Sequence, residues 1–184
     1  MDKPLALSDI EETTRPKVYR QQYGHQEFID GVKIVTLKHA VGEEGDFSEL
    51  MRLDAKGEPA EFPGFRLAQV NYSTQFPGSI KAWHMHMRQD ELWYVPEEAH
   101  LLAGLWDVRK SSKTRDMTNK VAMGGSSHRL LYIPRGVAHG AANFSKKQGI
   151  IIYFVSEQFN KENPDEYRIP WNALGADFWT PERD

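Results

Sequence analysis

The stretch KAWHMHMRQDELWYV, residues 81–95, consists of two runs of strand-forming residues with a polar interruption between them. The interruption MRQD, residues 87–90, has the composition of a turn, so we expect a second strand to begin at Glu91. Side chains alternate between the two faces of a strand, so His84 and His86 are predicted to point the same way. If the two strands form a hairpin, the Glu91 carboxylate returns to the interior that the two imidazoles face.

The same β pattern extends along the chain from Gly31 onward, as short apolar runs separated by turn-forming residues. Turn compositions recur at 42–46, 134–136 and 146–149, and helical periodicity is hard to find before Glu157. The predicted strands are VKIVTLKHAV, FRLAQVNYS, KAWHMHM, ELWYV, LLAGLWDVR, RLLYIP and GIIIYFVS. Short strands at this spacing predict an all-β jelly-roll barrel, which protects strand edges by pairing two sheets.

A chain of 184 residues suits one domain preceded by an arm. Residues 1–25 are polar and interrupted by two prolines, so we expect an arm that becomes ordered only by lying on another surface. Residues 26–184 are predicted to form the single domain. Within it the barrel spans about 45–156, and the turn-rich extension 157–184 contains one short helical turn.

Composition excludes several functional classes. The 23 Lys and Arg against 26 Asp and Glu give a net charge of −3, which favours neither nucleic acid nor an anionic membrane as a partner. No stretch approaches the roughly 20 apolar residues that span a bilayer, and the start lacks an apolar signal region, so we expect a cytoplasmic protein. Without cysteine, any metal must be held by His, Asp or Glu, the ligands that suit iron, zinc, nickel or manganese.

A third histidine, His139, follows the Pro-Arg-Gly turn and begins the next predicted strand. With His84, His86 and Glu91 it completes three imidazoles and one carboxylate, a set that can bind a divalent metal and leave positions for water or substrate. An H-x-H pair alone is weak evidence, because a single strand histidine is usually a surface residue or a hydrogen-bonded one. The joint spacing, G-x5-H-x-H-x4-E and P-x-G-x2-H-x3-N, resembles the two-part signature of metal-binding cupins.

A longer resemblance extends from about Gly45 to Trp179. It is carried, in order, by GDFSE at 45–49, QVNYS at 69–73, KAWH at 81–84, WDVRKSS at 106–112, IPRGVAHG at 133–140, YFVS at 153–156 and IPWN at 169–172. These motifs are similar to those of the dTDP-4-dehydrorhamnose 3,5-epimerase family, which consists of dimeric cupins that act on nucleotide-linked keto sugars. The resemblance implies a sugar or nucleotide-sugar substrate and a homodimer.

Site roles follow from this resemblance. The family's general base falls on His84 and its general acid on Tyr153, on opposite sides of the sugar. Tyr153 is equally compatible with a strand aromatic whose hydroxyl bonds to a neighbour. The residues expected to bind substrate are Phe47, Glu49, Arg66, Gln69, Asn71 and Lys81.

Two departures from the family pattern affect the chemistry. The aspartate that orients the family's base is replaced by Ala173, and the lysine that stabilises the enolate oxygen is replaced by Glu91. Because Glu91 also belongs to the cupin metal signature, a metal can replace the lysine as the electrophile. His84 is then a ligand, and the base is another group.

Three functions stay open at this level. The leading hypothesis is a metal-dependent keto-sugar epimerase or isomerase. The second is an iron- or nickel-dependent dioxygenase, which uses the same ligand types. The third is a non-catalytic sugar- or metal-binding cupin, which the loss of the family's aspartate and lysine suggests.

Overall fold

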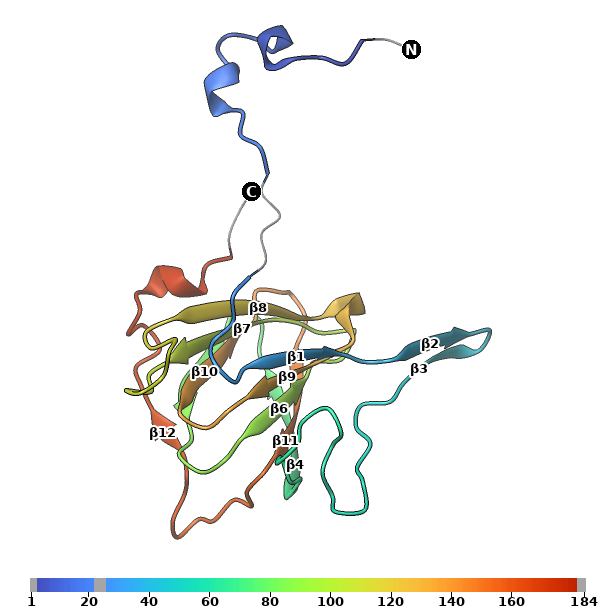
Figure 1. Ribbon diagram of the computed structural model, residues 1–184, viewed down its shortest axis with the longest axis vertical. Helices are drawn as coiled ribbons and strands as arrows, with labels where there is room; N and C mark the ends of the chain where they lie inside the picture. The colour runs from blue at the N-terminus through green and yellow to red at the C-terminus, as the bar shows by residue number, and fades with distance from the viewer. Residues whose placement is uncertain (1–2, 22–25, 182–184) are drawn as a thin grey trace.

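The computed structural model describes residues 3–21 and 26–181, and its regular structure there is almost entirely β (Figure 1). One five-stranded antiparallel sheet has the order β1-β9-β6-β11-β4, the other has the order β12-β5-β10-β7-β8, and β2 pairs with β3 alone. The strands are β1 (Lys33–Thr36), β2 (His39–Gly42), β3 (Gly45–Ser48), β4 (Gln69–Gln75), β5 (Ile80–Met85), β6 (Glu91–Tyr94), β7 (His100–Asp107), β8 (Thr118–Gly124), β9 (Arg129–Ile133), β10 (Val137–Ala142), β11 (Gly149–Val155) and β12 (Tyr167–Arg168). The predicted all-β jelly roll is confirmed.

The connection between β5 and β6 differs from the sequence prediction. A strand does end at Met85 and another does begin at Glu91, with bends between them. The predicted hairpin is wrong, because β5 pairs with β10 and β12 while β6 pairs with β9 and β11 in the facing sheet. The polar residues 87–90 therefore cross between the sheets, and both strands still turn one face toward the same interior.

Strand β8 is absent from the predicted set, although it pairs with β7 along its whole length. Its sequence TNKVAMG mixes polar and apolar residues, and only alternate residues, Asn119, Val121 and Met123, are buried. As an edge strand it needs an apolar face on one side alone, so it shows no continuous apolar run. The alternation of inward- and outward-facing residues is the signal from which this strand could have been predicted.

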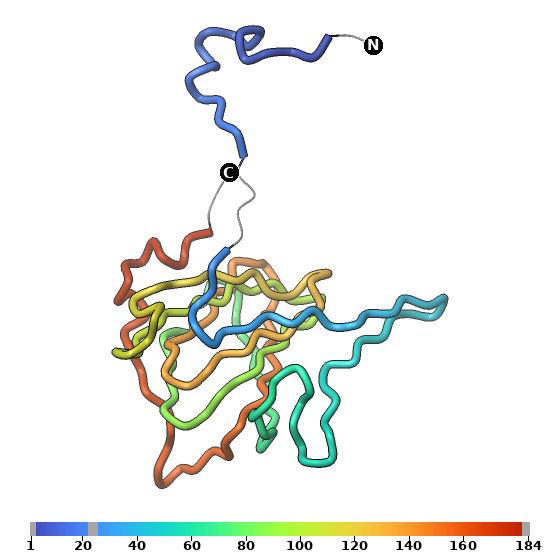
Figure 2. Tube along the Cα trace, in the orientation of Figure 1, coloured from blue at the N-terminus to red at the C-terminus, as the bar shows by residue number. Residues whose placement is uncertain are grey.

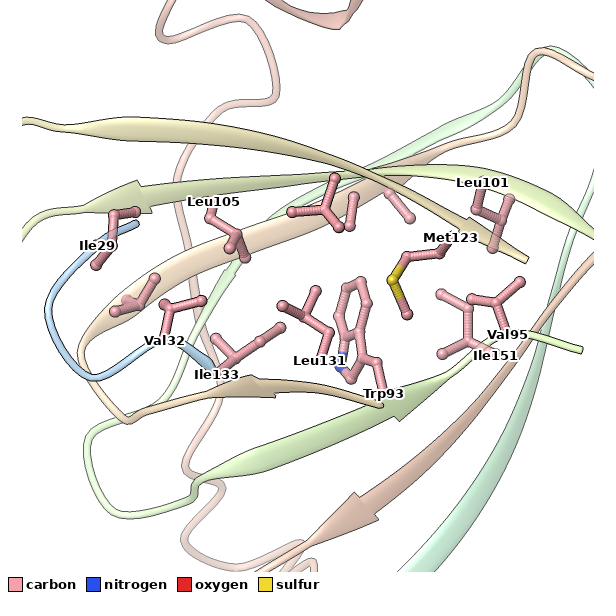
Figure 3. Close-up of a cluster of buried hydrophobic side chains, with 14 of the residues drawn as sticks. Ile29, Val32, Trp93, Val95, Leu101, Leu105, Met123, Leu131, Ile133 and Ile151 are labelled. Atoms are coloured by element: carbon pink, nitrogen blue, oxygen red, sulfur yellow. The ribbon is translucent and has the colours of Figure 1, made fainter. Parts of the chain in front are cut away.

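The core lies between the two sheets (Figure 3). Trp93, Leu131 and Ile133 come from one sheet, and Leu105 and Met123 from the other, all nearly or fully buried. Burying aliphatic and aromatic side chains of this size stabilises the fold by about 1.5–3 kcal/mol each. This packing makes the barrel a rigid support for side chains at its open end.

The C-terminal extension packs on the outer face of the second sheet. It follows β11, passes along the edge of that sheet as β12 and ends in the 3-10 turn η4 (Ala176–Trp179), as the trace in Figure 2 shows. Trp179 packs on Trp83 with ring centroids 4.6 Å apart. A Cβ at Gly104 would lie 2.6 Å from the Trp179 ring, so only glycine fits beneath it. The expected helical turn is thus confirmed as a 3-10 turn.

The described part of the N-terminal arm, residues 3–21, contains the 3-10 turns η1 (Leu7–Asp9) and η2 (Arg15–Lys17) and buries no side chain. The remainder of the predicted arm, at 1–2 and 22–25, and the last three residues of the domain lie outside the described residues. Across residues 3–21 and 26–181, helices are too short to cross a bilayer.

Candidate active site

A pocket of about 360 Å³ opens between the two sheets, bordered by the C-terminal extension. Of the residues predicted for the site, it is lined by Gln69, Asn71, Lys81, His84, His86, Glu91, His139 and Tyr153. Residues far apart in sequence meet here because the chain crosses repeatedly from one sheet to the other. The predicted parity is confirmed, since both histidines of the H-x-H pair face this pocket.

Three of the four predicted metal ligands form one buried cluster. The Nε2 atom of His86 lies 3.0 Å from one Glu91 carboxylate oxygen, and the Nε2 atom of His139 lies 3.5 Å from the other. His86 is 8% exposed, Glu91 6% and His139 3%. One donor atom from each lies within 4.8 Å of the other two. This spacing can accommodate a single ion.

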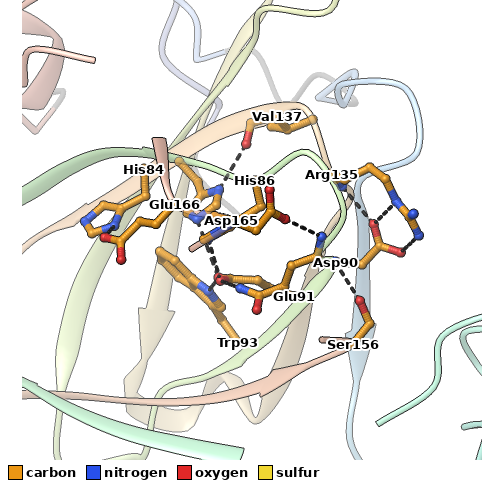
Figure 4. A network of polar contacts seen from close by, with 12 residues as sticks. His84, His86, Asp90, Glu91, Trp93, Arg135, Val137, Ser156, Asp165 and Glu166 are labelled. Carbon is orange, nitrogen blue, oxygen red and sulfur yellow. Dashed lines mark hydrogen bonds and ion pairs between the residues drawn. The ribbon is translucent and has the colours of Figure 1, made fainter. Parts of the chain in front are cut away.

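Backbone carbonyls fix the orientation of both imidazoles. The Nδ1 atom of His139 donates to the Val137 carbonyl at 3.0 Å, and the Nδ1 atom of His86 contacts the Asp165 carbonyl (Figure 4). Each Nε2 atom is therefore directed at the Glu91 carboxylate. Metal-ligating histidines typically donate their second ring N–H in this way, so the donor set fits a divalent metal.

The buried carboxylate and the two imidazoles of this cluster shift one another's pKa. Burial opposes ionisation of Glu91, but His139 and His86 outweigh it and lower the pKa of the carboxyl to about 2. Burial also opposes protonation of His86, yet the bond to Glu91 raises the pKa of this imidazole. Burial lowers the pKa of His139. Both ring nitrogens of His86 face oxygen acceptors, which favours its protonated form, and a divalent ion at this position would compete with that proton.

His84, the fourth predicted ligand, lies beside this cluster and has other partners. Its Nε2 atom lies 2.9 Å from Nη1 of Arg168 and its Nδ1 atom 3.5 Å from the Glu166 carboxylate. Burial, His139 and Arg168 lower the pKa of His84 to about 4. His84 is therefore a neutral imidazole at physiological pH, and one of its ring nitrogens can accept a proton.

The segment before β12 supports the pocket from the C-terminal side. The Asp165 carboxylate accepts hydrogen bonds from the backbone amides of Met87, Arg88 and Gln89 at 2.7–3.0 Å. These bonds lower the pKa of Asp165 against the effect of burial. Asp165 thus fixes the crossing that follows His86.

Tyr153 stands on the facing sheet, on β11. Its ring packs edge-on against Trp93 with centroids 5.4 Å apart, and its hydroxyl bonds to Ser73. Burial raises the pKa of this phenol, so Tyr153 keeps its proton and can donate it. On the same wall, Gln69 donates to Asn71 at 2.6 Å, as expected from their shared strand face.

The other residues predicted to bind substrate lie elsewhere. Phe47 and Glu49 line a second pocket of about 580 Å³ beside the β2–β3 hairpin, which projects from the barrel (Figure 1). Phe47 is 68% exposed, Glu49 pairs with Arg52 at 2.6 Å, and Arg66 is exposed and lines neither pocket. The substrate role of Phe47, Glu49 and Arg66 stays a prediction. The homodimer, like the cytoplasmic location, stays a prediction.

Two facing sheets that enclose histidines, a carboxylate and a tyrosine define a cupin-type jelly-roll protein. The family model of dTDP-4-dehydrorhamnose 3,5-epimerase matches residues 26–183. The chain therefore belongs to the dTDP-4-dehydrorhamnose 3,5-epimerase family, as its motifs indicated.

Relatives and solved structures agree with this family. The spore coat polysaccharide biosynthesis protein SpsL of Bacillus subtilis (strain 168) is 40% identical over 155 residues, which cover 84% of this chain and 98% of SpsL. A dTDP-6-deoxy-D-glucose-3,5-epimerase from Legionella pneumophila, solved with dTDP-4-keto-L-rhamnose, has a TM-score of 0.70 and 24% identity, covering 85% of this chain and 82% of its own. The dTDP-4-dehydrorhamnose 3,5-epimerase of Sulfolobus tokodaii has a TM-score of 0.66 and 25% identity, and the match covers 78% of this chain and 80% of the Sulfolobus chain.

Proposed function

We propose that the protein is an epimerase or isomerase that moves protons on carbons next to the carbonyl of a nucleotide-linked 4-keto sugar. One observation carries the proposal: a neutral imidazole, His84, and a protonated phenol, Tyr153, line the same pocket from facing sheets. A base on one side of a sugar and an acid on the other can invert a carbon. The Legionella structure with its bound keto sugar supports the substrate class.

In this mechanism the Nε2 lone pair of His84 accepts a proton from the carbon adjacent to the carbonyl. The electrons of the C–H bond move into an enolate, and the Tyr153 hydroxyl returns a proton to the opposite face. Arg168, which occupies Nε2 in the free protein, must move aside as substrate enters. Lys81, held at 2.7 Å from the Thr74 carbonyl on the pocket rim, supplies a positive charge for the diphosphate.

Incubation with dTDP-4-keto-6-deoxyglucose in deuterated water tests this function. Each proton transfer exchanges a carbon-bound hydrogen with solvent, so we expect deuterium to appear at a carbon next to the carbonyl, detected by mass spectrometry and NMR. A panel of dTDP- and UDP-linked 4-keto sugars would define the nucleotide. Absence of deuterium from all of them would contradict the epimerase proposal, and oxygen uptake instead would favour a dioxygenase.

We also propose that His86, Glu91 and His139 bind one divalent ion, whether iron, zinc, nickel or manganese. The support is their arrangement, with both Nδ1 atoms bonded to backbone carbonyls and both Nε2 atoms directed at the carboxylate. When bound, such an ion supplies a positive charge that can stabilise an enolate oxygen. His86 would then give up the proton that it shares with Glu91.

Replacing His139 with glutamine should weaken metal binding. We expect about one ion per chain in the wild-type protein and at least about tenfold weaker binding in His139→Gln, because a ligand is lost. Elemental analysis and competition with a chelating dye measure both. His100→Gln, at an exposed position on β7, is the matched control. Equal metal content in the two variants would contradict the site.

A further inference from the structure

The C-terminal extension gives His84 two charged partners. Arg168 lies directly opposite His84 in the β12–β5 pairing, and Glu166, two residues earlier, lies on the same side. The Glu166 carboxylate is 3.5 Å from Nδ1 of His84 and 2.5 Å from Nη2 of Arg168, while Nη1 of Arg168 is 2.9 Å from Nε2 of His84. The three side chains form a closed ring of contacts, part of which is visible in Figure 4.

This ring fixes the position of the proton on His84. An arginine can only donate, so the Nε2 atom of His84 that faces Arg168 must be the acceptor. In the neutral imidazole the proton is then on Nδ1, facing Glu166. The lone pair on Nε2 is therefore the one available to a substrate once Arg168 moves.

Other carboxylates near His84 are already engaged. Both oxygens of Glu91 face His86 and His139, and Asp165 accepts three backbone amides. Ala173 stands where the family has its orienting aspartate. Within the described ranges, Glu166 is the carboxylate that lies within ion-pair distance of His84.

We propose that Glu166, directly before β12, is the positioning residue for His84 and supplies the carboxylate that Ala173 does not. This inference rests on the proposed function. When Nε2 takes the substrate proton, the Nδ1 proton stays directed at Glu166, and the carboxylate stabilises the imidazolium that forms. The same carboxylate binds Arg168, so it holds the guanidinium near the pocket when the substrate displaces it from Nε2.

The kinetic test compares Glu166→Gln with Glu166→Asp and with Glu162→Gln, a control at an exposed position in the same extension. Glutamine keeps an acceptor but removes the charge, so we expect kcat to fall at least about tenfold while KM changes less than about twofold. Aspartate should restore part of the rate, and the control should match the wild type. An unchanged kcat, or a rise in KM alone, would overturn the positioning role.

Nitrogen NMR of the His84 ring tests the same role without turnover. The wild-type ring should show one tautomer, with its proton on Nδ1. Glu166→Ala removes both the carboxylate that faces Nδ1 and the ion pair that holds Arg168 against Nε2, so this variant should show both tautomers, and thermal melting verifies folding. A single unchanged tautomer in the alanine variant would contradict the inference. The wild-type protein could also keep the single tautomer but exchange no substrate hydrogen. That result would contradict the proposed function, and Glu166 would still be the partner that orients His84.

Discussion

Replacing His84 with asparagine should lower kcat by about 10²- to 10⁴-fold, the usual contribution of a general base. The imidazole is neutral and faces the pocket, so its loss would remove the proposed base. Asparagine can still contact Arg168, and KM should therefore change little. Steady-state kinetics and the rate of deuterium incorporation from solvent measure the effect.

Metal content separates the two roles that the sequence allowed for His84. As a base, His84 can be replaced without loss of metal, whereas His86→Asn should lose it, since His86 lies in the cluster with Glu91 and His139. His100→Asn serves as the control for a histidine substitution. If His84→Asn lost its metal together with its activity, the four-ligand site would be correct and the base would be another group.

Much of the site could be predicted from local patterns. Alternation along a strand predicted that His84 and His86 face one interior, and the Pro-Arg-Gly turn predicted that His139 begins a strand. The structure agrees in register, because His139 lies directly opposite His84 in the β10–β5 pairing. Such predictions succeed because side-chain direction in a strand depends on near neighbours alone.

The partners of these histidines could not be predicted in the same way. Arg168 is 84 residues from His84 and Asp165 is 79 from His86, and the strand that carries the arginine has only two residues. Nothing in the polar sequence NPDEYRIPW marks which side chain turns toward the pocket. These contacts give His84 partners other than His86, Glu91 and His139. The sequence alone therefore left open whether His84 is a base or a metal ligand.

A buried aspartate at the end of β7, Asp107, should make a large contribution to stability. Asp107 is 0% exposed and accepts hydrogen bonds from Arg109, Ser112 and Thr114 at 2.5–3.1 Å. Arg109 also donates to the Asp30 carbonyl at 2.6 Å, and Thr114 accepts from the Asp30 amide at 2.8 Å. The cluster thus joins the chain entering β1 to the loop after β7.

Replacing Asp107 with asparagine should lower the free energy of unfolding at pH 7 by about 2–4 kcal/mol, since a buried charge that accepts several hydrogen bonds is lost. The NH2 group of the asparagine would also point toward the hydrogen-bond donors of Arg109, Ser112 and Thr114 and could not accept from them. Urea unfolding followed by fluorescence measures the difference. Asp116→Asn, an exposed position in the same loop with φ of 68°, is the control and should change stability by less than about 0.5 kcal/mol.

The effect of Asp107 should also depend on pH in a defined direction. Burial would raise the pKa of its carboxyl, but the hydrogen bonds from Arg109, Ser112 and Thr114 lower it well below the ordinary range. A group whose pKa is lower in the folded state stabilises that state above its unfolded pKa, about 3.9, and loses the contribution as pH falls toward the folded value. The stability difference between wild type and Asp107→Asn should therefore be constant above pH 5 and shrink below pH 4, as measured by urea unfolding across that range. A difference that stays the same down to pH 2.5 would show that the asparagine acts through altered packing and not through the loss of charge.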